Sequence, residues 1–292
     1  MQSETVESSA PSPSPFLKWA GGKGSLLHSL LPLVPERMSN YYEPFLGGGS
    51  LFFAICSRKV AFHAHLSDLN NELINAYTVI RDRTEELIGF LSKLQYEYDH
   101  SASQSRYYYS IRDRHPSNSV QSAARLIFLN KTCYNGLYRV NSQGEFNVPF
   151  GRYLKPKILN VENIRAVGKA LRDTSADLLS IDYKTSLASC GKNDLVYLDP
   201  PYQPLSKTSS FTDYTPAGFS EHDQRELAEQ FNNLVDRGCI VLLSNSATPL
   251  TVSLYSDFET RNVTVNRPIN SVGARRTGYR ELLVVGNTRF PN

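Results

Sequence analysis

The sequence predicts a doubly wound α/β fold, in which helices cover a largely parallel sheet and an inserted lobe interrupts the chain. Apolar strand patterns alternate with amphipathic helix patterns on both sides of the insertion. The polar motifs of the chain follow directly after these strands. Since ligands of such sheets bind at the carboxyl ends of the strands, we expect the motifs to form one site.

The elements before the insertion begin after residues 1–15, a segment rich in Ser, Pro and Glu that we expect to be a disordered tail. Hydrophobic periodicity and turn residues then predict the elements in order. They are a loop and short helix over 16–32, a strand ending at 41–45, a helix over 50–56, a strand reaching 66–68 and a helix over 70–80.

The inserted lobe covers residues 76–164, where the pattern changes to helices with Tyr-rich and basic faces. Two segments of alternating apolar and polar residues on either side of 141–144 predict a hairpin. Between Arg125 and Lys157 there are six basic residues and a single acid, Glu145. Such a segment suits a nucleic-acid surface, although a charge cluster by itself is more often a solvated face.

The elements after the insertion complete the sheet. They are strands over 178–182, 194–198, 239–243 and 281–285, with a helix over 220–237. Residues 16–75 and 165–292 are therefore expected to form one domain and the insertion a second. A chain of 292 residues is long enough to bury one sizeable core and an additional lobe.

The composition is that of an ordinary soluble protein, with 40% hydrophobic residues and a net charge of +3. The four cysteines are widely scattered, without the pairing of zinc motifs or the density of a secreted scaffold. We therefore predict no metal site and a cytoplasmic location. No apolar run approaches membrane-spanning length, and the N-terminal segment lacks the features of a signal peptide.

A glycine-rich turn follows the first predicted strand. Its candidate ligand-binding residues are Glu43, Phe45, Gly47 and Gly49. Consecutive glycines let backbone N–H groups approach a ligand closely, although a purely structural turn is the alternative. Asp68 ends the next strand about twenty residues later, where a carboxylate accepts the hydroxyls of a ribose. The spacing indicates a nucleoside site, and the missing G-x-G-x-x-G pattern disfavours a dinucleotide.

A competing nucleotide site is a phosphate loop at residues 21–25, Gly-Gly-Lys-Gly-Ser. The phosphate-loop pattern requires a glycine where Leu17 stands and Ser or Thr directly after the lysine, where Gly24 stands. No strong strand precedes the loop. A nucleoside triphosphatase is therefore disfavoured.

The strand 194–198 delivers a candidate catalytic tetrapeptide, Asp199, Pro200, Pro201 and Tyr202, to its carboxyl end. The two prolines fix the backbone and remove two N–H donors, which leaves hydrogen-bond acceptors beside a stacking ring. Asp199 and the Pro200 carbonyl would accept hydrogen bonds from the amine of an aromatic base, and Tyr202 would stack on a base rotated out of a duplex. A rigid turn after a core strand is the alternative.

Methylation at cytosine C5 is disfavoured because that chemistry needs a thiolate nucleophile in a characteristic loop. None of the four cysteines follows the proline typical of that loop. Transfer to an exocyclic amine is therefore the favoured chemistry.

In this order, the motifs resemble those of the DNA adenine methylase family, whose members carry the cofactor motifs first and a recognition lobe before the catalytic tetrapeptide. The resemblance runs from Phe16 to Asn287 and rests on five segments: Phe16–Lys23, Glu43–Gly49, Ser67–Asp68, Leu129–Tyr153 and Asp199–Tyr202. It implies a Rossmann-like methyltransferase that uses S-adenosylmethionine to methylate adenine N6 in double-stranded DNA. The inserted lobe would then be the target recognition domain.

The resemblance also implies which residues bind the cofactor. The residues that contact S-adenosylmethionine would be Trp19, Lys23, Asp68 and Asp199. Lys23 would lie near its carboxylate and Asp68 at its ribose, while Asp182 and Tyr183 would hold its adenine. Trp19 as a plain core residue and Asp182 as a helix cap are the alternatives.

The segment 134–153 resembles the recognition hairpin of family members that methylate GATC. Arg139 is then the expected bidentate partner of a guanine, whereas without the family a phosphate or solvent contact is the commoner role. Base recognition would be completed by Asn135, Leu137, Pro149 and Tyr153. Phosphate contacts, which make binding depend on salt, are expected from Lys131, Arg152, Lys155, Lys157, Arg275 and Arg276.

Two rival functions stay open at this point. The same acceptor geometry serves amino methyltransferases that act on cytosine N4, RNA or a protein glutamine, and the product distinguishes these. A DNA-binding protein with an inactive catalytic fold is the second rival, which the presence of both the carboxylate and the stacking ring disfavours. A monomer is the default for a base-flipping enzyme of this size.

Overall fold

One sheet of seven strands forms in the part of the chain that the computed structural model describes, residues 11–19, 21–58, 60–202, 219–265 and 279–290. The strand order across the sheet is β3–β2–β1–β4–β5–β7–β6. The strands are β1 (Asn40–Glu43), β2 (His63–Ser67), β3 (Asp177–Leu179), β4 (Leu195–Leu198), β5 (Ile240–Ser246), β6 (Glu259–Val265) and β7 (Tyr279–Gly286).

The first five strands pair in parallel, and β7 runs antiparallel between β5 and β6. This confirms the largely parallel, doubly wound sheet that the sequence predicts. The strand order reverses between β1 and β4, which is the point where such sheets bind their ligands. Glu43 ends β1 and Asp199 directly follows β4, so both residues lie at this point.

Helices cover both faces of the sheet, because alternate strand residues point to opposite faces. Tyr41 shares one apolar core with helices on its face, and its neighbour Tyr42 belongs to a second core. The helices of the first core are α2 (Ser50–Cys56), α3 (Asn71–Asp82) and α7 (Val161–Asp173). Those of the second are α8 (Tyr183–Ser186), α9 (Glu221–Asp236) and α10 (Pro249–Leu254).

Several helices, among them α3 and α9, begin at polar residues that cap their first turn. The Asn70 side chain accepts a hydrogen bond of 3.0 Å from a backbone N–H in the first turn of α3. Ser220 and Asp223 form a capping box at the start of α9. The predicted short helix is α1 (Leu27–Leu30), which lies between two 3₁₀ turns, η1 (Lys23–Leu26) and η2 (Leu31–Leu33). It ends before Pro32, whose missing N–H cannot continue it.

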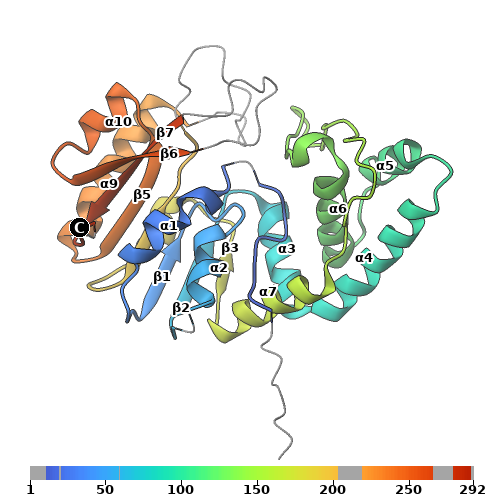
Figure 1. Ribbon diagram of the computed structural model, residues 1–292, viewed down its shortest axis with the longest axis horizontal. Coiled ribbons are helices and arrows are strands. Elements are labelled where there is room, and N and C mark those ends of the chain that lie inside the picture. The colour runs from blue at the N-terminus through green and yellow to red at the C-terminus, as the bar shows by residue number, and fades with distance from the viewer. Residues whose placement is uncertain (1–10, 20, 59, 203–218, 266–278, 291–292) are drawn as a thin grey trace, which may run out of the picture.

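The lobe between α3 and α7 contains α4 (Thr84–Asp99), α5 (Gln104–Arg112) and α6 (Ser119–Thr132), followed by the short turn η3 (Tyr134–Gly136). Figure 1 shows these helices on one side of the molecule and α9 and α10 on the other. Leu91 and Phe128 of the lobe belong to the same apolar core as Tyr77 of α3. Burial of this shared surface holds the lobe against the sheet.

The segment 134–153 lacks the two regular strands that the sequence pattern predicts. Its antiparallel pairing is limited to two isolated bridges, Cys133 with Phe150 and Val140 with Phe146. Positive φ angles at Asn135 and Arg152 interrupt the extended backbone. The chain turns back at residues 141–144 as predicted, where the Asn147 N–H donates to the Arg139 carbonyl at 3.0 Å, but regular strands do not form on either side. We call this segment the recognition loop after the role that the sequence predicts for it.

The edge strand β6 was not predicted from the sequence. Its described side chains are mostly exposed, so it lacks the apolar run or clean alternation that marks a strand. Its pairing with β7 creates it. Within the described ranges, no helix is both long enough and apolar enough to cross a membrane.

Candidate active site

The carboxylate of Asp199 lies at the centre of the polar groups that gather where the strand order reverses, between β1 and β4. Its Oδ2 atom is 2.8 Å from Nζ of Lys23, and the Lys23 side chain is only 6% exposed. The Ser244 hydroxyl donates to its Oδ1 atom at 2.8 Å. Burial raises the pKa of Asp199, and the ammonium of Lys23 opposes this rise. Both oxygens of the carboxylate are therefore held in fixed positions.

Tyr202 places its ring beside this ion pair. Nζ of Lys23 lies 4.6 Å from the centre of the Tyr202 ring, within the range of a cation–π contact. The Tyr202 hydroxyl donates to Oε2 of Glu281 at 2.8 Å, and Glu281 is buried. Glu281 thus fixes the orientation of the ring, while Lys23 contacts both the ring and Asp199.

The diproline is supported from the second core. The buried Gln224 of α9 donates to the Pro201 carbonyl at 3.4 Å, and Asn245 of β5 donates to the Gln224 side chain at 2.9 Å. Pro200 is itself buried. The backbone between Asp199 and Tyr202 is therefore held both by its prolines and by this pair of amides.

Glu43 is a second buried carboxyl near Asp199. The Tyr41 hydroxyl donates to its Oε2 atom at 2.8 Å. Burial raises the pKa of Glu43 to about 8, which the charge of Asp199 reinforces and the hydrogen bond from Tyr41 opposes. Glu43 therefore carries a proton at neutral pH.

The glycine turn after β1 contacts Asp68. The Gly47 N–H donates to Oδ2 of Asp68 at 2.9 Å, and the Asn70 N–H donates to Oδ1 at 2.9 Å. Gly47 has a φ of 47°, and a Cβ atom there would come within 2.9 Å of the Trp19 ring. The turn therefore requires glycine, and it packs against Trp19, one of the predicted cofactor residues.

Asp182 and Tyr183 follow β3 as predicted, but Asp182 acts as a helix cap here. Its Oδ1 atom accepts the Lys184 N–H at 2.8 Å at the start of α8. The Tyr183 ring is buried and lies 5.4 Å from the Phe45 ring, with 30° between their planes. The chain thus brings two aromatic residues together from the ends of β1 and β3.

The recognition loop and the preceding helix α6 are tied to the segment that precedes η1. The buried Asn130 side chain accepts the Lys18 N–H at 2.8 Å and donates to the Lys18 carbonyl at 2.7 Å. The rings of Trp19 and Tyr138 are 5.5 Å apart. Nζ of Lys18 lies 4.2 Å from the centre of the Tyr153 ring. These contacts place the loop next to the cofactor motifs.

The Arg139 side chain is exposed and is held by hydrogen bonds within its own loop. Its Nε atom donates to Oδ1 of Asn147 at 2.6 Å, and its Nη2 atom donates to the Asn147 carbonyl at 3.3 Å. The other predicted base-recognition residues are exposed or half-buried: Asn135, Leu137, Pro149 and Tyr153. The Arg139 guanidinium is thus exposed, and its N–H groups are bound to Asn147.

The predicted phosphate contacts differ in their surroundings. Lys131 is half-buried, and this burial, reinforced by the charge of Lys18, lowers its pKa to about 8. Arg152, Lys155 and Lys157 are exposed. Arg275 and Arg276 lie outside the described residues. The exposed cations lie in and directly after the recognition loop.

Sequence reasoning missed four polar residues that hold the site, namely Gln224, Ser244, Asn245 and Glu281. Each is buried among apolar residues of α9, β5 or β7. Glu281 could have been noticed, because an acid that opens an apolar strand must find a buried partner or face solvent. Its partner, Tyr202, is remote in sequence, and no local pattern identifies it.

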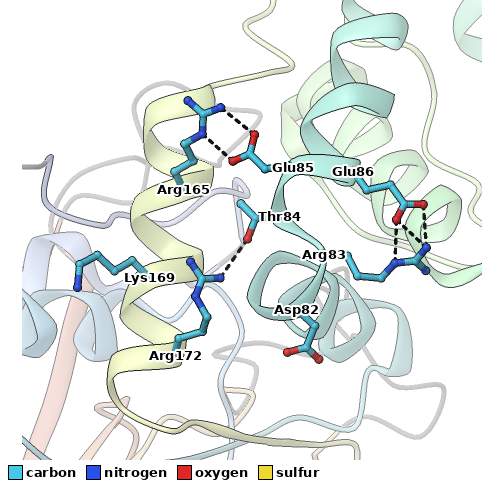
Figure 2. Close-up of a pocket in the computed structure, with 8 residues that line it drawn as sticks. All are labelled: Asp82, Arg83, Thr84, Glu85, Glu86, Arg165, Lys169 and Arg172. Atoms are coloured by element: carbon cyan, nitrogen blue, oxygen red, sulfur yellow. Dashed lines mark hydrogen bonds and ion pairs between the residues drawn. The ribbon is translucent and has the colours of Figure 1, made fainter.

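A hollow away from the strand ends is lined by charged residues of α3, α4 and α7 (Figure 2). Arg165 makes two hydrogen bonds of 2.8 Å to the Glu85 carboxylate, and Nη1 of Arg172 donates to Thr84 at 3.1 Å. These charges already have partners. The hollow is therefore a salt-bridged junction between the lobe and α7, and it offers no reactive arrangement.

The chain was compared with known proteins. The family model for D12 class N6 adenine-specific DNA methyltransferases matches residues 19–269. The type II methyltransferase M1.LlaDCHI of Lactococcus lactis subsp. cremoris is 40% identical over 276 residues, which cover 92% of this chain and 94% of that protein. The type II methyltransferase M.MjaIII of Methanocaldococcus jannaschii is 39% identical, covering 93% and 98%. The DNA adenine methylase of Escherichia coli (strain K12) is 37% identical, covering 92% and 94%.

Proposed function

The chain belongs to the D12 class of N6 adenine-specific DNA methyltransferases, and from this premise we propose that it methylates adenine within GATC in double-stranded DNA. The target adenine is rotated out of the duplex, and S-adenosylmethionine is the donor. One observation carries the proposal: the half-buried Asp199 carboxylate lies beside the Tyr202 ring, and both are fixed by buried side chains. The protein acts as a monomer in the cytoplasm.

The residues at the carboxyl ends of β1, β2 and β3 fit S-adenosylmethionine. Each oxygen of Asp68 accepts one backbone N–H and keeps a lone pair for a ribose hydroxyl. Because Gly47 has no side chain, its backbone beside the Trp19 ring stays accessible to a ligand. The stacked rings of Phe45 and Tyr183 offer an apolar surface for adenine. When bound, the cofactor supplies a methyl group on a positively charged sulfur.

The acceptor groups of the catalytic tetrapeptide orient the adenine amine. Asp199 and the Pro200 carbonyl accept hydrogen bonds from its two N–H groups, which directs the nitrogen lone pair toward the methyl group. Tyr202 stacks on the extruded base. Asp199, whose pKa is raised by burial, is placed to take the proton that the amine gives up.

Lys23 has to move before the base can stack. In the chain alone its ammonium contacts both Asp199 and the face of the Tyr202 ring. We propose that it turns toward the carboxylate of the bound cofactor, which vacates the ring for adenine. Cofactor binding would then prepare the site for the base.

The recognition loop reads the target sequence. Arg139 releases Asn147 and donates to the two acceptors of a guanine, and Asn135, Leu137, Pro149 and Tyr153 complete recognition or fill the space left by the flipped base. The exposed Arg152, Lys155 and Lys157, together with Lys131, neutralise phosphates. Arg275 and Arg276 are proposed for the same role.

The proposal is tested with two duplexes that differ only in GATC or GTAC at the centre. Each is incubated with the protein and methyl-labelled S-adenosylmethionine, and the DNA is then digested to nucleosides. We expect labelled N6-methyl-2′-deoxyadenosine from the GATC duplex alone. Label on cytosine, no label on either duplex, or equal label on both duplexes would reject the proposed target.

Base flipping is tested separately. A GATC duplex that carries 2-aminopurine in place of the target adenine should become more fluorescent when the protein and S-adenosylhomocysteine are added, because the base loses its stacking partners. The same substitution outside GATC serves as the control. No increase, or an equal increase at both positions, contradicts extrusion.

A further inference from the structure

Two histidines and an aspartate gather at the β2–β3 edge of the sheet, apart from the catalytic tetrapeptide. His63 and His65 are two residues apart on β2, so their side chains lie on the same face. Asp177 of β3 pairs with His65 in the parallel register. This pairing brings a carboxylate next to both imidazoles.

The three groups converge on a small volume. Nδ1 of His65 is 2.9 Å from Oδ2 of Asp177, and Nε2 of His63 is 3.2 Å from the same oxygen. The two imidazole rings are stacked 4.4 Å apart. One ligand atom from each residue lies within 4.8 Å of the others. Ligand atoms around a tetrahedral zinc ion at about 2.0–2.1 Å are roughly 3.3 Å apart, so the spacing is suitable for one ion.

Hydrogen bonds around His65 determine which of its nitrogens is free to bind a cation. The Asn40 side-chain N–H donates to the buried Asp194 carboxylate at 2.8 Å, which turns the Asn40 amide oxygen toward Nε2 of His65 at 3.4 Å. This contact favours the tautomer with the proton on Nε2, in which the lone pair of Nδ1 faces Asp177. In that tautomer two acceptors lie 2.9 Å apart, and a cation bound between them, or a proton on Nδ1, removes their repulsion.

His63 gives a second, independent indication. Its Nε2 atom is buried and makes no hydrogen bond within the described structure, although a carboxylate oxygen lies 3.2 Å away. A buried polar atom without a hydrogen bond is costly. A cation bound to Nε2 would remove this cost.

We propose that His63, His65 and Asp177 form a binding site for a zinc-class divalent cation. Two imidazoles and one carboxylate are ligands that zinc accepts, and the amide of Asn40 orients His65 as outer partners commonly orient ligating histidines. The side chains of His63 and Asp177 are 42% and 49% exposed, so water can reach the fourth position.

The position of the site indicates a structural role. The ligands join β2 to β3, a strand of only three residues at the sheet edge. A bound cation would fasten this edge, after which the chain continues to Asp182 and Tyr183. The site does not depend on the proposed function, because none of its ligands belongs to the catalytic or recognition residues. The cysteine spacing that predicted no metal site carries no information about this strand pair.

The site is tested by adding ZnCl₂ alone to the full chain after removal of metals by chelator and dialysis. Calorimetry should show one bound zinc per chain, and zinc should raise the thermal unfolding temperature. His65→Ala and Asp177→Asn should each weaken zinc binding at least about tenfold. Substitution of Co²⁺ should give the visible absorption bands of a low-symmetry, nearly tetrahedral site.

His222→Ala is the matched control, because His222 is a histidine that lies 3.8 Å from the carboxylate of Glu226 but outside the three-residue cluster. It should leave zinc binding unchanged. Circular dichroism verifies that each variant is folded, and Asp177→Asn keeps the shape of the side chain. Absence of zinc binding at 100 µM, or equal binding by wild type and His65→Ala, would overturn the proposal.

Discussion

The catalytic strand ends and the recognition loop are organised in opposite ways. At the strand ends, the Asp199 carboxylate is bound by Lys23 and Ser244, and the Tyr202 hydroxyl is bound by a buried acid. In the recognition loop, Arg139 is exposed and is held by Asn147 of the same loop, between two isolated bridges. The difference teaches that the groups proposed for the chemistry are already fixed by buried partners, whereas the groups proposed for recognition are held only by their own loop and are free to exchange partners if DNA binds there.

The largest expected effect is that of Asp199→Ala, which removes the preorganised acceptor. Turnover on a GATC duplex should fall by at least about 10³-fold, because the amine loses its orienting carboxylate. DNA affinity, measured by fluorescence anisotropy, should change little. The exposed Asp236 on α9 provides a matched control, and Asp236→Ala should keep full activity. If Asp199→Ala retains substantial turnover, the strand ends are not the catalytic region.

A smaller effect is expected in the recognition loop. Arg139→Ala should reduce the preference for GATC over a duplex with one altered guanine by roughly 10- to 100-fold, since a bidentate contact to guanine is worth about 1–3 kcal/mol. Competition assays with the two duplexes measure this preference.

Lys157→Ala provides the contrast for Arg139. A phosphate contact should weaken binding to both duplexes equally and reduce the salt dependence by about one charge. An unchanged sequence preference in Arg139→Ala would show that this loop does not read the guanine.

Glu281 is expected to act through Tyr202, with a moderate effect on the rate. Glu281→Leu removes the acceptor of the Tyr202 hydroxyl and should lower kcat by about tenfold while leaving KM for the cofactor unchanged. Glu281→Gln keeps an acceptor and should restore most of the rate. If kcat falls equally in both variants, Glu281 has a purely structural role. The same holds if the fall in kcat follows only from a lower unfolding temperature.

The last prediction concerns Glu43 and the way in which the stability of the folded protein depends on pH. The pKa of its carboxyl is raised from 4.5 to about 8 in the folded chain, so between these values only the folded state holds the proton. The stability contributed by this group therefore falls as pH rises through the window, by no more than about 1.4 kcal/mol per pH unit.

The amide of Glu43→Gln does not titrate, so the free energy of unfolding of this variant should fall less than that of the wild type between pH 5.5 and pH 8. Thermal unfolding at several pH values measures this difference, with Glu36→Gln as an exposed control. A constant difference between Glu43→Gln and wild type across this range would contradict the raised pKa.

The sequence predicted the strand ends far better than the recognition loop. Asp199 directly follows the apolar run of β4, and the glycine turn and Asp68 directly follow β1 and β2, so local pattern was enough to place them. The loop has the alternation of a hairpin, but positive φ angles and tertiary contacts such as the hydrogen bond from Asn130 to the Gly136 carbonyl determine its shape.

Partners that are remote in sequence could not be predicted. Glu281 meets Tyr202 only because β7 enters the sheet beside β5, and His65 meets Asp177 only because β3 pairs with β2. The strand order of the sheet creates both contacts, and no spacing along the chain reveals them.

The central claim is that Asp199 and Tyr202 receive an extruded adenine once Lys23 has moved. A crystal structure of the protein with S-adenosylhomocysteine and a GATC duplex tests it most directly. The account predicts the adenine amine about 3 Å from an Asp199 oxygen, the base stacked on Tyr202 and Lys23 away from that ring. An adenine still paired within the duplex, or Lys23 still covering the ring beneath a bound base, would contradict it.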